Sequence, residues 1–286
     1  MTVQNDVLSA HTVLCDLDGV VWLAHEPIPG SVDAIARIRA GGRRVVFVTN
    51  NSMSLVAEQE AALERVGIPA VGDVVTSAMA GASLVEPGER VLVAGGSGVV
   101  EAVERRGATA VPNDGTDARR AESAAGSFDA VVVGLHRDFD YHRLATASTA
   151  VMAGARLIGT NGDSTYPTAD GLLPGGGSLV AAVATVAGVD PVIAGKPNRP
   201  MAELIADMVG GGAAGAGLVM VGDRLDTDGA FAATLGCPFV LVRSGVTTPD
   251  QALAAQEHDG PDVAVDVADL ASFADRLANA ASPTGQ

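Results

Sequence analysis

The chain has 286 residues, a length that suits two domains or one large domain with an insertion. Its 34 acidic and 18 basic residues give a formal net charge of −16, which argues against nucleic acid or an anionic membrane as a partner. Hydrophobic residues make up 48% of the chain and aromatic residues only 3%, so aliphatic side chains must form the core. An anionic small molecule remains open as a ligand, because one metal ion and one lysine can reverse the local field.

Targeting and redox signals point to a cytoplasmic protein. The N-terminus has no basic region followed by an apolar one, and no apolar stretch reaches the length of a membrane span. Cys15 and Cys237 lie far apart without metal-ligand or redox spacing, so we expect reduced thiols in the core.

The first part of the chain alternates between short apolar runs and amphipathic segments. We expect strands at residues 13–15, 44–48 and near Val74, and helices at residues 31–40 (capped by Ser31), 54–66 and up to about residue 86. Strands that alternate with helices in this way predict a parallel, doubly wound sheet.

A second alternation begins near Val91 and can fill a small α/β domain of its own. Its strands are expected at residues 91–94, near Ala110, and at 130–134 and 156–159, with helices ending near Arg105 and spanning 141–152 and 178–187. The first pattern then resumes, with strands at residues 191–194, 218–221, 238–242 and near Val263, and helices at 200–209, up to Leu235 and from about Asp266.

Polar, reactive residues follow four of these strands. They are Asp16 and Asp18, Thr49 with Asn50 and Asn51, Lys196, and Asp223 with Asp228. Each has an ordinary explanation by itself: a turn or calcium loop, a helix cap, a surface lysine. In an open parallel sheet, however, ligands bind outside the carboxyl ends of the strands, so these residues are expected to converge on one crevice.

These motifs resemble those of the haloacid dehalogenase-like (HAD) hydrolase superfamily. In order they read Asp-Leu-Asp-Gly, Thr-Asn-Asn-Ser, Gly-Lys-Pro and Gly-Asp-Arg-Leu-Asp-Thr-Asp. The long insertion resembles the C2-type cap of class IIA, the branch of 4-nitrophenylphosphatases, NagD-like proteins, and phosphoglycolate and glycerol-phosphate phosphatases. The resemblance implies a Rossmann-like core of residues 1–86 and 190–286 and a smaller α/β cap of residues 87–189.

The resemblance also implies the roles of the core residues. Asp16 would attack phosphorus to form an aspartyl-phosphate, and Asp18 would protonate the leaving alcohol and later deprotonate water. A second aspartate at that position fits an oxygen leaving group, which needs a proton, and so favours a phosphatase over a dehalogenase. Thr49, Asn50 and Asn51 would hold the phosphate, and Lys196 would offset its charge.

The implied cofactor is Mg²⁺, a hard cation that prefers oxygen ligands. The Asp16 carboxylate, the Asp18 backbone carbonyl and Asp223 would bind it, and Asp228 would orient Lys196 or metal-bound water. The implied partner is a small phosphorylated metabolite, with a homodimer through the cap left open.

The cap is expected to supply specificity through Asn161, Asp163 and Tyr166. Tyr166 stands where pyridoxal phosphatases place a substrate-contacting histidine, and Met53 where they usually carry arginine, which argues against pyridoxal phosphate. Tyr166 is equally well explained as a half-buried packing residue. Glycerol phosphate, phosphoglycolate, sugar phosphates and nucleotides all stay open as substrates.

Three other functions compete with a phosphatase. The glycine-rich run at residues 91–98 suggests a dinucleotide-binding oxidoreductase, but Glu101 stands where that pattern wants glycine or alanine. A non-catalytic phosphoacceptor would be much shorter and would have no cap, and Asp18 would work against a long-lived phosphoaspartate. A phosphotransferase of the same superfamily usually carries a cap after the first motif, and only about 30 residues separate Asp18 from Thr49.

Overall fold

The computed structural model describes residues 3–23, 25–115, 128–168, 171–210, 215–251 and 260–281. Within these residues no helix combines the length and the apolar character needed to span a membrane. The elements in chain order are α1 (Val3–Ser9), β1 (Thr12–Cys15), β2 (Trp22–Leu23), β3 (Glu26–Pro27), α2 (Ser31–Ala40), β4 (Arg44–Thr49), α3 (Val56–Arg65), β5 (Val74–Thr76), α4 (Ser77–Ala82), β6 (Arg90–Ala94), α5 (Ser97–Arg105), β7 (Thr109–Pro112), β8 (Ala130–Val133), α7 (Tyr141–Met152), β9 (Arg156–Gly159), β10 (Thr165–Thr168), β11 (Gly171–Pro174), α8 (Gly176–Ala187), β12 (Val192–Ile193), α9 (Arg199–Val209), β13 (Leu218–Gly222), the π-helical turn η1 (Leu225–Gly229), α10 (Ala230–Leu235), β14 (Phe239–Val242), β15 (Val263–Val267) and α12 (Leu270–Ala281).

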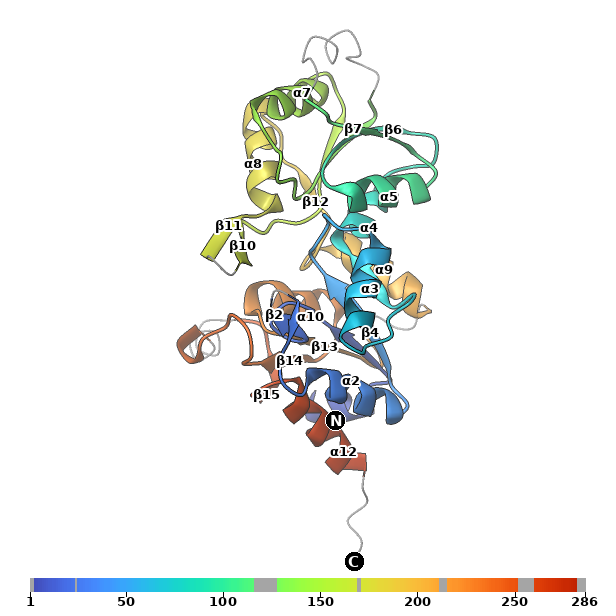
Figure 1. Ribbon diagram of the computed structural model, residues 1–286, viewed down its shortest axis with the longest axis vertical. Helices are drawn as coiled ribbons and strands as arrows, with labels where there is room; N and C mark the ends of the chain where they lie inside the picture. Colours follow the sequence, from blue (N-terminus) through green and yellow to red (C-terminus); the bar gives the residue numbers. More distant parts are fainter. Residues whose placement is uncertain are drawn as a thin grey trace, which may run out of the picture. The chain divides into compact units, whose positions relative to one another are not determined.

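A six-stranded sheet has the order β15-β14-β13-β1-β4-β5, and β1 pairs in parallel with both β4 and β13. Figure 1 labels β4, β13, β14 and β15 of this sheet. All four residues of β1 are buried, because its apolar run is covered on both faces. The strand order reverses beside β1: the chain moves outward through β4 and β5 on one side and through β13, β14 and β15 on the other. Such a switch point leaves a ligand crevice at the carboxyl ends of the two strands that flank it, here β1 and β13.

A five-stranded parallel sheet has the order β12-β9-β8-β6-β7. Alternate residues of β8 point to opposite faces: Ala130 and Val132 pack in one hydrophobic cluster with α4 and α5, and Val131 and Val133 in another with α7 and α8. In Figure 1, α7 and α8 lie beside each other, as do α4 and α5. The expected α/β class, with a doubly wound parallel sheet and a second, smaller α/β layer system, is confirmed.

The chain divides into two compact units. The first unit contains Met1–Thr49, Gln59–Val75 and Ile205–Gln286, and the second contains Asn50–Glu58 and Thr76–Leu204. The domain boundaries at residues 86/87 and 189/190 stay a prediction. In the first unit, α12 packs beside α2 near the sheet (Figure 1).

Several local expectations were wrong. Residues 191–194 do not return to the six-stranded sheet, because β12 pairs with β9 of the five-stranded one. Ser31 does not cap α2; its hydroxyl donates to the Val21 carbonyl at 2.7 Å, and Gly30 occupies the N-cap position. The last helix begins at Leu270 rather than near Asp266, which belongs to β15.

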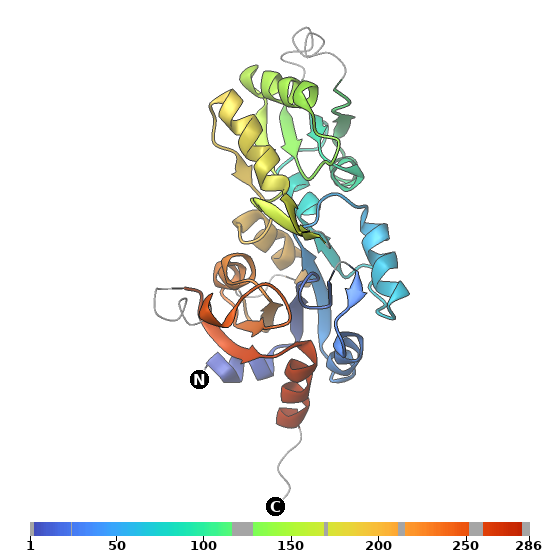
Figure 2. The ribbon, with the colours of Figure 1, turned by 60° about the vertical axis from the view of Figure 1, so that its left-hand side comes forward.

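A hairpin of β10 and β11 is an addition to the strands expected from the sequence. Its strands pair antiparallel and lead directly into α8 (Figure 2). Neither strand alternates cleanly between apolar and polar residues, and β11 is exposed throughout, so no buried face marks it in the sequence.

Candidate active site

Asp16 directly follows the central strand β1. Its backbone N–H donates to the Val221 carbonyl at 3.0 Å, which continues the β1–β13 ladder by one residue, and its side chain is only 8% exposed. Asp18, two residues on, is exposed. Gly19 ends the motif with φ +88°, a conformation that other residues rarely adopt. The two acids therefore differ in environment: one is buried at the strand end and the other is open to water.

Asp223 and Asp228 follow the neighbouring strand β13 and are almost completely buried, at 1% and 0% exposure. The turn η1 folds Asp228 back so that its Oδ2 accepts hydrogen bonds from the N–H groups of Asp223 and Arg224, each at 3.2 Å. One carboxylate oxygen from each of Asp16, Asp223 and Asp228 lies within 4.8 Å of the others. We call these three residues the acidic cluster.

The acidic cluster fits a hard divalent cation. Three carboxylates this close repel one another unless a cation or a shared proton relieves them, and carboxylate oxygens are the ligands that Mg²⁺ and Ca²⁺ prefer. The side chain of Asp18 is not part of the cluster, which agrees with a role for its backbone carbonyl but does not test it. The expectation of a metal-binding protein is thus supported by a suitable donor set.

Three glycines surround the acidic cluster closely. A Cβ atom on Gly19 would lie 2.5 Å from Cγ of Asp223, and one on Gly245 would lie 2.0 Å from Oδ2 of Asp223. A Cβ atom on Gly222 would lie 2.3 Å from Cβ of Asp228. These positions leave room for hydrogen only, so the carboxylates are held by close backbone approach.

Residues 243–248, after β14, brace the same cluster and were missed in the sequence. The Val246 N–H donates to Oδ2 of Asp223 at 2.6 Å, and the Ser244 hydroxyl donates to the Gly19 carbonyl at 2.7 Å. Arg243 anchors the segment through Nε, 2.8 Å from Oδ1 of Asp266 on β15. The signal that could have found it is its position, since it follows another strand of the same sheet.

The second unit holds its own polar cluster, built around Asn50. Its amide nitrogen donates to both carboxylate oxygens of Asp163, at 3.1 and 3.3 Å, and to the Lys196 carbonyl at 3.1 Å. Its amide oxygen accepts from the Lys196 N–H at 2.9 Å, and the Asn161 amide donates to the Asn50 carbonyl at 2.8 Å. Asn50, Asn161, Asp163 and Lys196 therefore meet, and we call them the amide cluster.

Two family models match the sequence that builds these sites. One, described as haloacid dehalogenase-like hydrolase, covers residues 13–109, and one described as HAD-hydrolase-like covers residues 193–270. The acid sugar phosphatase of Staphylococcus saprophyticus is 33% identical over 247 residues, which span 83% of this chain and 88% of that protein. The chain belongs to the haloacid dehalogenase-like hydrolase family.

Further HAD relatives carry similar names. D-glycerol 3-phosphate phosphatase of Mycobacterium tuberculosis is 40% identical over 249 residues, spanning 85% of this chain and 66% of that protein, just under two thirds of its length. The structure of glycerol phosphate phosphatase from the same organism, in complex with magnesium, matches with a TM-score of 0.81 at 34% identity and covers 100% of this chain and 83% of that one. The expected superfamily and its class IIA, NagD-like branch are confirmed, and with them an enzyme family whose named relatives are phosphatases.

The dinucleotide-binding alternative is disfavoured within this HAD chain by the start of α5. The Gly98 N–H donates to the Met53 carbonyl at 3.0 Å, and a Cβ atom on Gly98 would lie 2.2 Å from the Ser54 carbonyl oxygen. In a dinucleotide-binding fold, the pyrophosphate occupies this helix N-terminus. Here the backbone of Met53 and Ser54 occupies the N-terminus of α5, and Gly98 allows this close approach because it has no Cβ atom.

The other predicted site residues have local partners. Thr49 is buried as the last residue of β4, and Oδ1 of Asn51 accepts from the Met53 N–H at 3.0 Å. Tyr166 is half-buried on β10, with the Arg137 guanidinium 6.0 Å from its ring centroid. Both explanations of Tyr166, substrate contact and packing, therefore stay open, and the roles of Thr49 and Asn51 stay predictions.

The cysteines of the chain are free thiols, as expected. Cys15 is buried in β1, and Cys237 is partly exposed just before β14. Burial raises the pKa of the Cys237 thiol to about 12, so it is protonated and unreactive at neutral pH. Neither thiol belongs to the acidic cluster.

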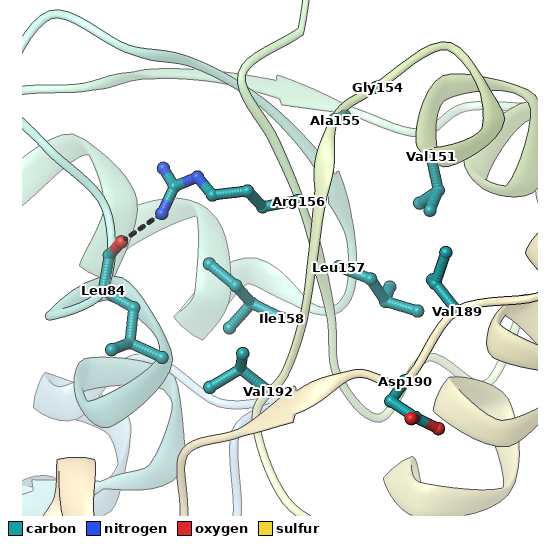
Figure 3. A pocket seen from close by; sticks show the side chains of 10 residues that line it. All are labelled: Leu84, Val151, Gly154, Ala155, Arg156, Leu157, Ile158, Val189, Asp190 and Val192. Carbon is teal, nitrogen blue, oxygen red and sulfur yellow. Dashed lines mark hydrogen bonds between the residues drawn. The ribbon is translucent and has the colours of Figure 1, made fainter.

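A cavity of about 430 Å³ in the second unit is lined mainly by apolar side chains, among them Leu84, Leu157 and Val192 (Figure 3). It lies beside the start of β9 and β12, whereas Asn161, Asp163 and Lys196 follow the carboxyl ends of the same strands. Arg156, which also lines the cavity, donates from Nη1 to the Leu84 carbonyl at 2.8 Å. This cavity is therefore separate from the amide cluster.

Proposed function

We propose that the protein is a Mg²⁺-dependent phosphatase that hydrolyses small-molecule phosphate monoesters. The observation that carries this proposal is the acidic cluster, three carboxylates at the carboxyl ends of two adjacent strands, beside the point where the strand order reverses. Its oxygen donors suit Mg²⁺, and a relative of known structure was solved with that ion. The phosphatase names of the relatives favour hydrolysis over phosphotransfer.

In the first step, a carboxylate oxygen of Asp16 attacks phosphorus, and the bond from phosphorus to the ester oxygen breaks. Asp18 donates its proton to the leaving oxygen, which departs as an alcohol. In the second step, water attacks the phosphorus of the aspartyl-phosphate and gives its proton to Asp18, so that free phosphate leaves and Asp16 is restored. The exposure of Asp18 supports this role, because it must exchange protons with water.

The remaining residues bind and balance charge. When bound, Mg²⁺ supplies positive charge against the phosphoryl oxygens; Asp16, Asp223 and the Asp18 carbonyl would hold it, and Asp228 would orient the neighbouring groups. Thr49 and the backbone N–H of Asn50 would hold phosphoryl oxygens, and Lys196 would offset the negative charge that the nucleophile and phosphate bring together. Asn51, Asn161, Asp163 and Tyr166 stay proposed substrate contacts.

The first substrate to test is glycerol phosphate, because the mycobacterial relative acts on D-glycerol 3-phosphate by name. Phosphoglycolate, sugar phosphates and nucleotides complete the panel, which is scored by kcat/KM. A cytoplasmic location and a homodimer remain predictions.

The decisive experiment measures Mg²⁺-dependent phosphate release from 4-nitrophenyl phosphate. Asp16→Asn is expected to abolish release, and Asp18→Asn to lower kcat by about 10²–10⁴-fold, the scale of a general acid/base. Asp33→Asn is a matched control, since Asp33 is an exposed carboxylate on α2 that pairs with Arg37 at 3.2 Å. Turnover that survives in Asp16→Asn would exclude Asp16 as the nucleophile, and a wild type without Mg²⁺-dependent turnover would refute the function.

A further inference from the structure

We infer that Asn50 is a positioning residue that fixes the backbone of Lys196 through its side-chain amide, in addition to any contact of its own backbone with substrate. This inference rests on the proposed function, in which Lys196 offsets the charge of the reacting phosphate. In this role Asp163 orients the Asn50 amide, and the amide fixes the backbone position from which the Lys196 side chain extends.

The amide of Asn50 takes both hydrogen-bonding groups of the Lys196 backbone. Its oxygen accepts from the N–H at 2.9 Å and its nitrogen donates to the carbonyl at 3.1 Å, across 146 residues of sequence. This pair of bonds is what a neighbouring strand supplies in a sheet. The Asn50 side chain thus supplies the two backbone hydrogen bonds of Lys196 that a neighbouring strand would otherwise supply.

The sheet itself ends just before the lysine. Strand β12 has only two residues. After it, the Ala194 N–H donates to the Gly159 carbonyl at 2.9 Å and the Gly195 N–H donates to the Thr160 carbonyl at 2.7 Å, so both stay bonded to β9 and the residue that follows it. The next N–H in line is that of Lys196, and Asn50 accepts it. Since an unmade backbone hydrogen bond in a buried segment is unfavourable, the amide is the natural anchor for residue 196, which is 3% exposed.

Asp163 determines which way the Asn50 amide faces. Its carboxylate accepts from the amide nitrogen at 3.1 and 3.3 Å, so the oxygen of the amide must face the Lys196 N–H. A carboxylate at position 50 could not reproduce this arrangement, because it cannot donate to the Lys196 carbonyl and it would face the Asp163 carboxylate at hydrogen-bonding distance. An asparagine is therefore the side chain that satisfies both neighbours.

The surroundings leave the amide little freedom. The Asn50 carbonyl accepts from the Ser77 hydroxyl at 2.6 Å and from the Asn161 amide at 2.8 Å, which fixes the backbone of Asn50 itself. A Cβ atom on Gly195 would lie 2.6 Å from Oδ1 of Asn50, so the chain entering Lys196 passes directly against the amide. The contact is thus braced on both sides, as a positioning role requires.

The first test is a double-mutant cycle on kcat. Displacing a charged group by about 1 Å can lower turnover by about 10²-fold, so Asn50→Ala is expected to lower kcat by about 10–10²-fold. If Asn50 acts through Lys196, the same change in a Lys196→Ala background lowers kcat by less than about twofold, because the effects of coupled residues are not additive. An equal loss in both backgrounds would overturn the inference.

An exchange of partners tests the part played by Asp163. Asn50→Asp should lower kcat at least as much as Asn50→Ala, because two carboxylates then face each other. Adding Asp163→Asn to that variant removes the repulsion and supplies an amide donor, so a recovery of about tenfold in kcat is expected from a restored charge-assisted contact. Absence of any recovery would contradict the role of Asp163 in orienting residue 50.

Amide hydrogen exchange tests the positioning without relying on activity. In Asn50→Ala the Lys196 N–H should exchange at least about tenfold faster, while the Gly195 N–H, bonded to the Thr160 carbonyl, changes little. Asn198→Ala is the matched control, because it removes a bond at 2.9 Å to the Gly195 carbonyl in the same turn and leaves both Asn50 bonds. Unchanged Lys196 exchange would overturn the inference, whereas an inactive wild type with faster Lys196 exchange in Asn50→Ala would refute only the proposed function.

Discussion

The acidic cluster and the amide cluster hold their charges in opposite ways. In the first, one oxygen from each of three carboxylates lies within 4.8 Å of the others, and backbone N–H groups and close glycines keep them there. In the second, the carboxylate of Asp163 and the backbone of Lys196 are joined by one neutral amide. The acidic cluster is held together against its own repulsion, and the amide cluster is held together by its own bonds.

This difference explains why one cluster is suited to a cation and the other to positioning. Carboxylates that repel one another are stabilised when a cation binds between them. Without the cation they cannot hold one another in place, so the surrounding backbone must fix their positions. A site whose polar groups satisfy one another gains little from a further ion and fixes the backbone instead. The predictions below separate these two kinds of support.

The largest effect is expected from Gly19→Ala, which tests the scaffold of the acidic cluster. The new methyl group would meet the Asp223 carboxylate at 2.5 Å, and Asp223 cannot move away because Val246 holds it at 2.6 Å. Overpacking and positive-φ strain together should lower the free energy of unfolding by about 2–4 kcal/mol and weaken Mg²⁺ binding at least about tenfold. Chemical denaturation and calorimetric titration with MgCl₂ measure both.

Gly42→Ala is the matched control for that variant. Gly42 has φ +80°, close to the +88° of Gly19, but an added Cβ atom would meet nothing within 4 Å. Gly42→Ala should suffer only the positive-φ strain, which lowers the free energy of unfolding by about 1 kcal/mol, and it should keep its Mg²⁺ affinity. Equal Mg²⁺ affinities in the two variants would show that Gly19 does not position Asp223.

A smaller effect of opposite sign in the two clusters is expected when one carboxylate is neutralised. Asp228→Asn removes repulsion that is worth up to about 3 kcal/mol per pair at this distance, so the metal-free protein should melt a few degrees higher while Mg²⁺ raises its Tm less. Asp163→Asn removes an acceptor of two contacts from Asn50, so it should lower Tm and leave the Mg²⁺-induced rise unchanged. Thermal melts with EDTA and with MgCl₂ compare the two, and a lower metal-free Tm in Asp228→Asn would contradict mutual repulsion in the acidic cluster.

The acidic cluster could be predicted largely from the sequence, because each carboxylate follows an apolar run. Such a run identifies a buried strand by itself, and parallel strands bring their carboxyl ends to one edge, so Asp16 and Asp223 were expected at one crevice without knowing the strand order. The structure adds that their two strands, β1 and β13, are neighbours. Asp228 needed only the short turn after β13. The sequence shows which residues follow the carboxyl end of each strand, and in a parallel sheet that is enough to place them at the same edge.

The amide cluster could be predicted only as a set of residues. Nothing in a two-residue strand shows which sheet it joins, so β12 was assigned to the wrong one. Asn50 was expected only to hold phosphate after its strand, whereas its side chain forms hydrogen bonds to residues 113 and 146 positions away in the sequence. The predicted Ser31 cap was wrong for the same reason, because the Ser31 hydroxyl donates to the distant Val21 carbonyl and does not cap its own helix.

The smallest effect is expected at Asp226, two residues before Asp228 in the same turn. The Arg224 guanidinium hydrogen-bonds to its carboxylate at 2.7 Å and lowers the pKa of Asp226. A lowered pKa gives stability that is present above the unfolded pKa, about 3.9, and is lost as the pH falls through the folded value. Because the side chain is 68% exposed, solvent screening limits this contribution to less than about 1 kcal/mol.

Asp226→Asn should therefore lower the free energy of unfolding slightly at pH 7, and the gap to the wild type should close as the pH falls below about 4. Mg²⁺ affinity should stay the same, because Asp226 lies outside the acidic cluster. Urea unfolding at a series of pH values, with a calorimetric Mg²⁺ titration at pH 7, measures both. A gap that widened in acid would mean that Asp226 is stabilised in its protonated form, and a loss of Mg²⁺ affinity would extend the acidic cluster to the exposed side of the turn.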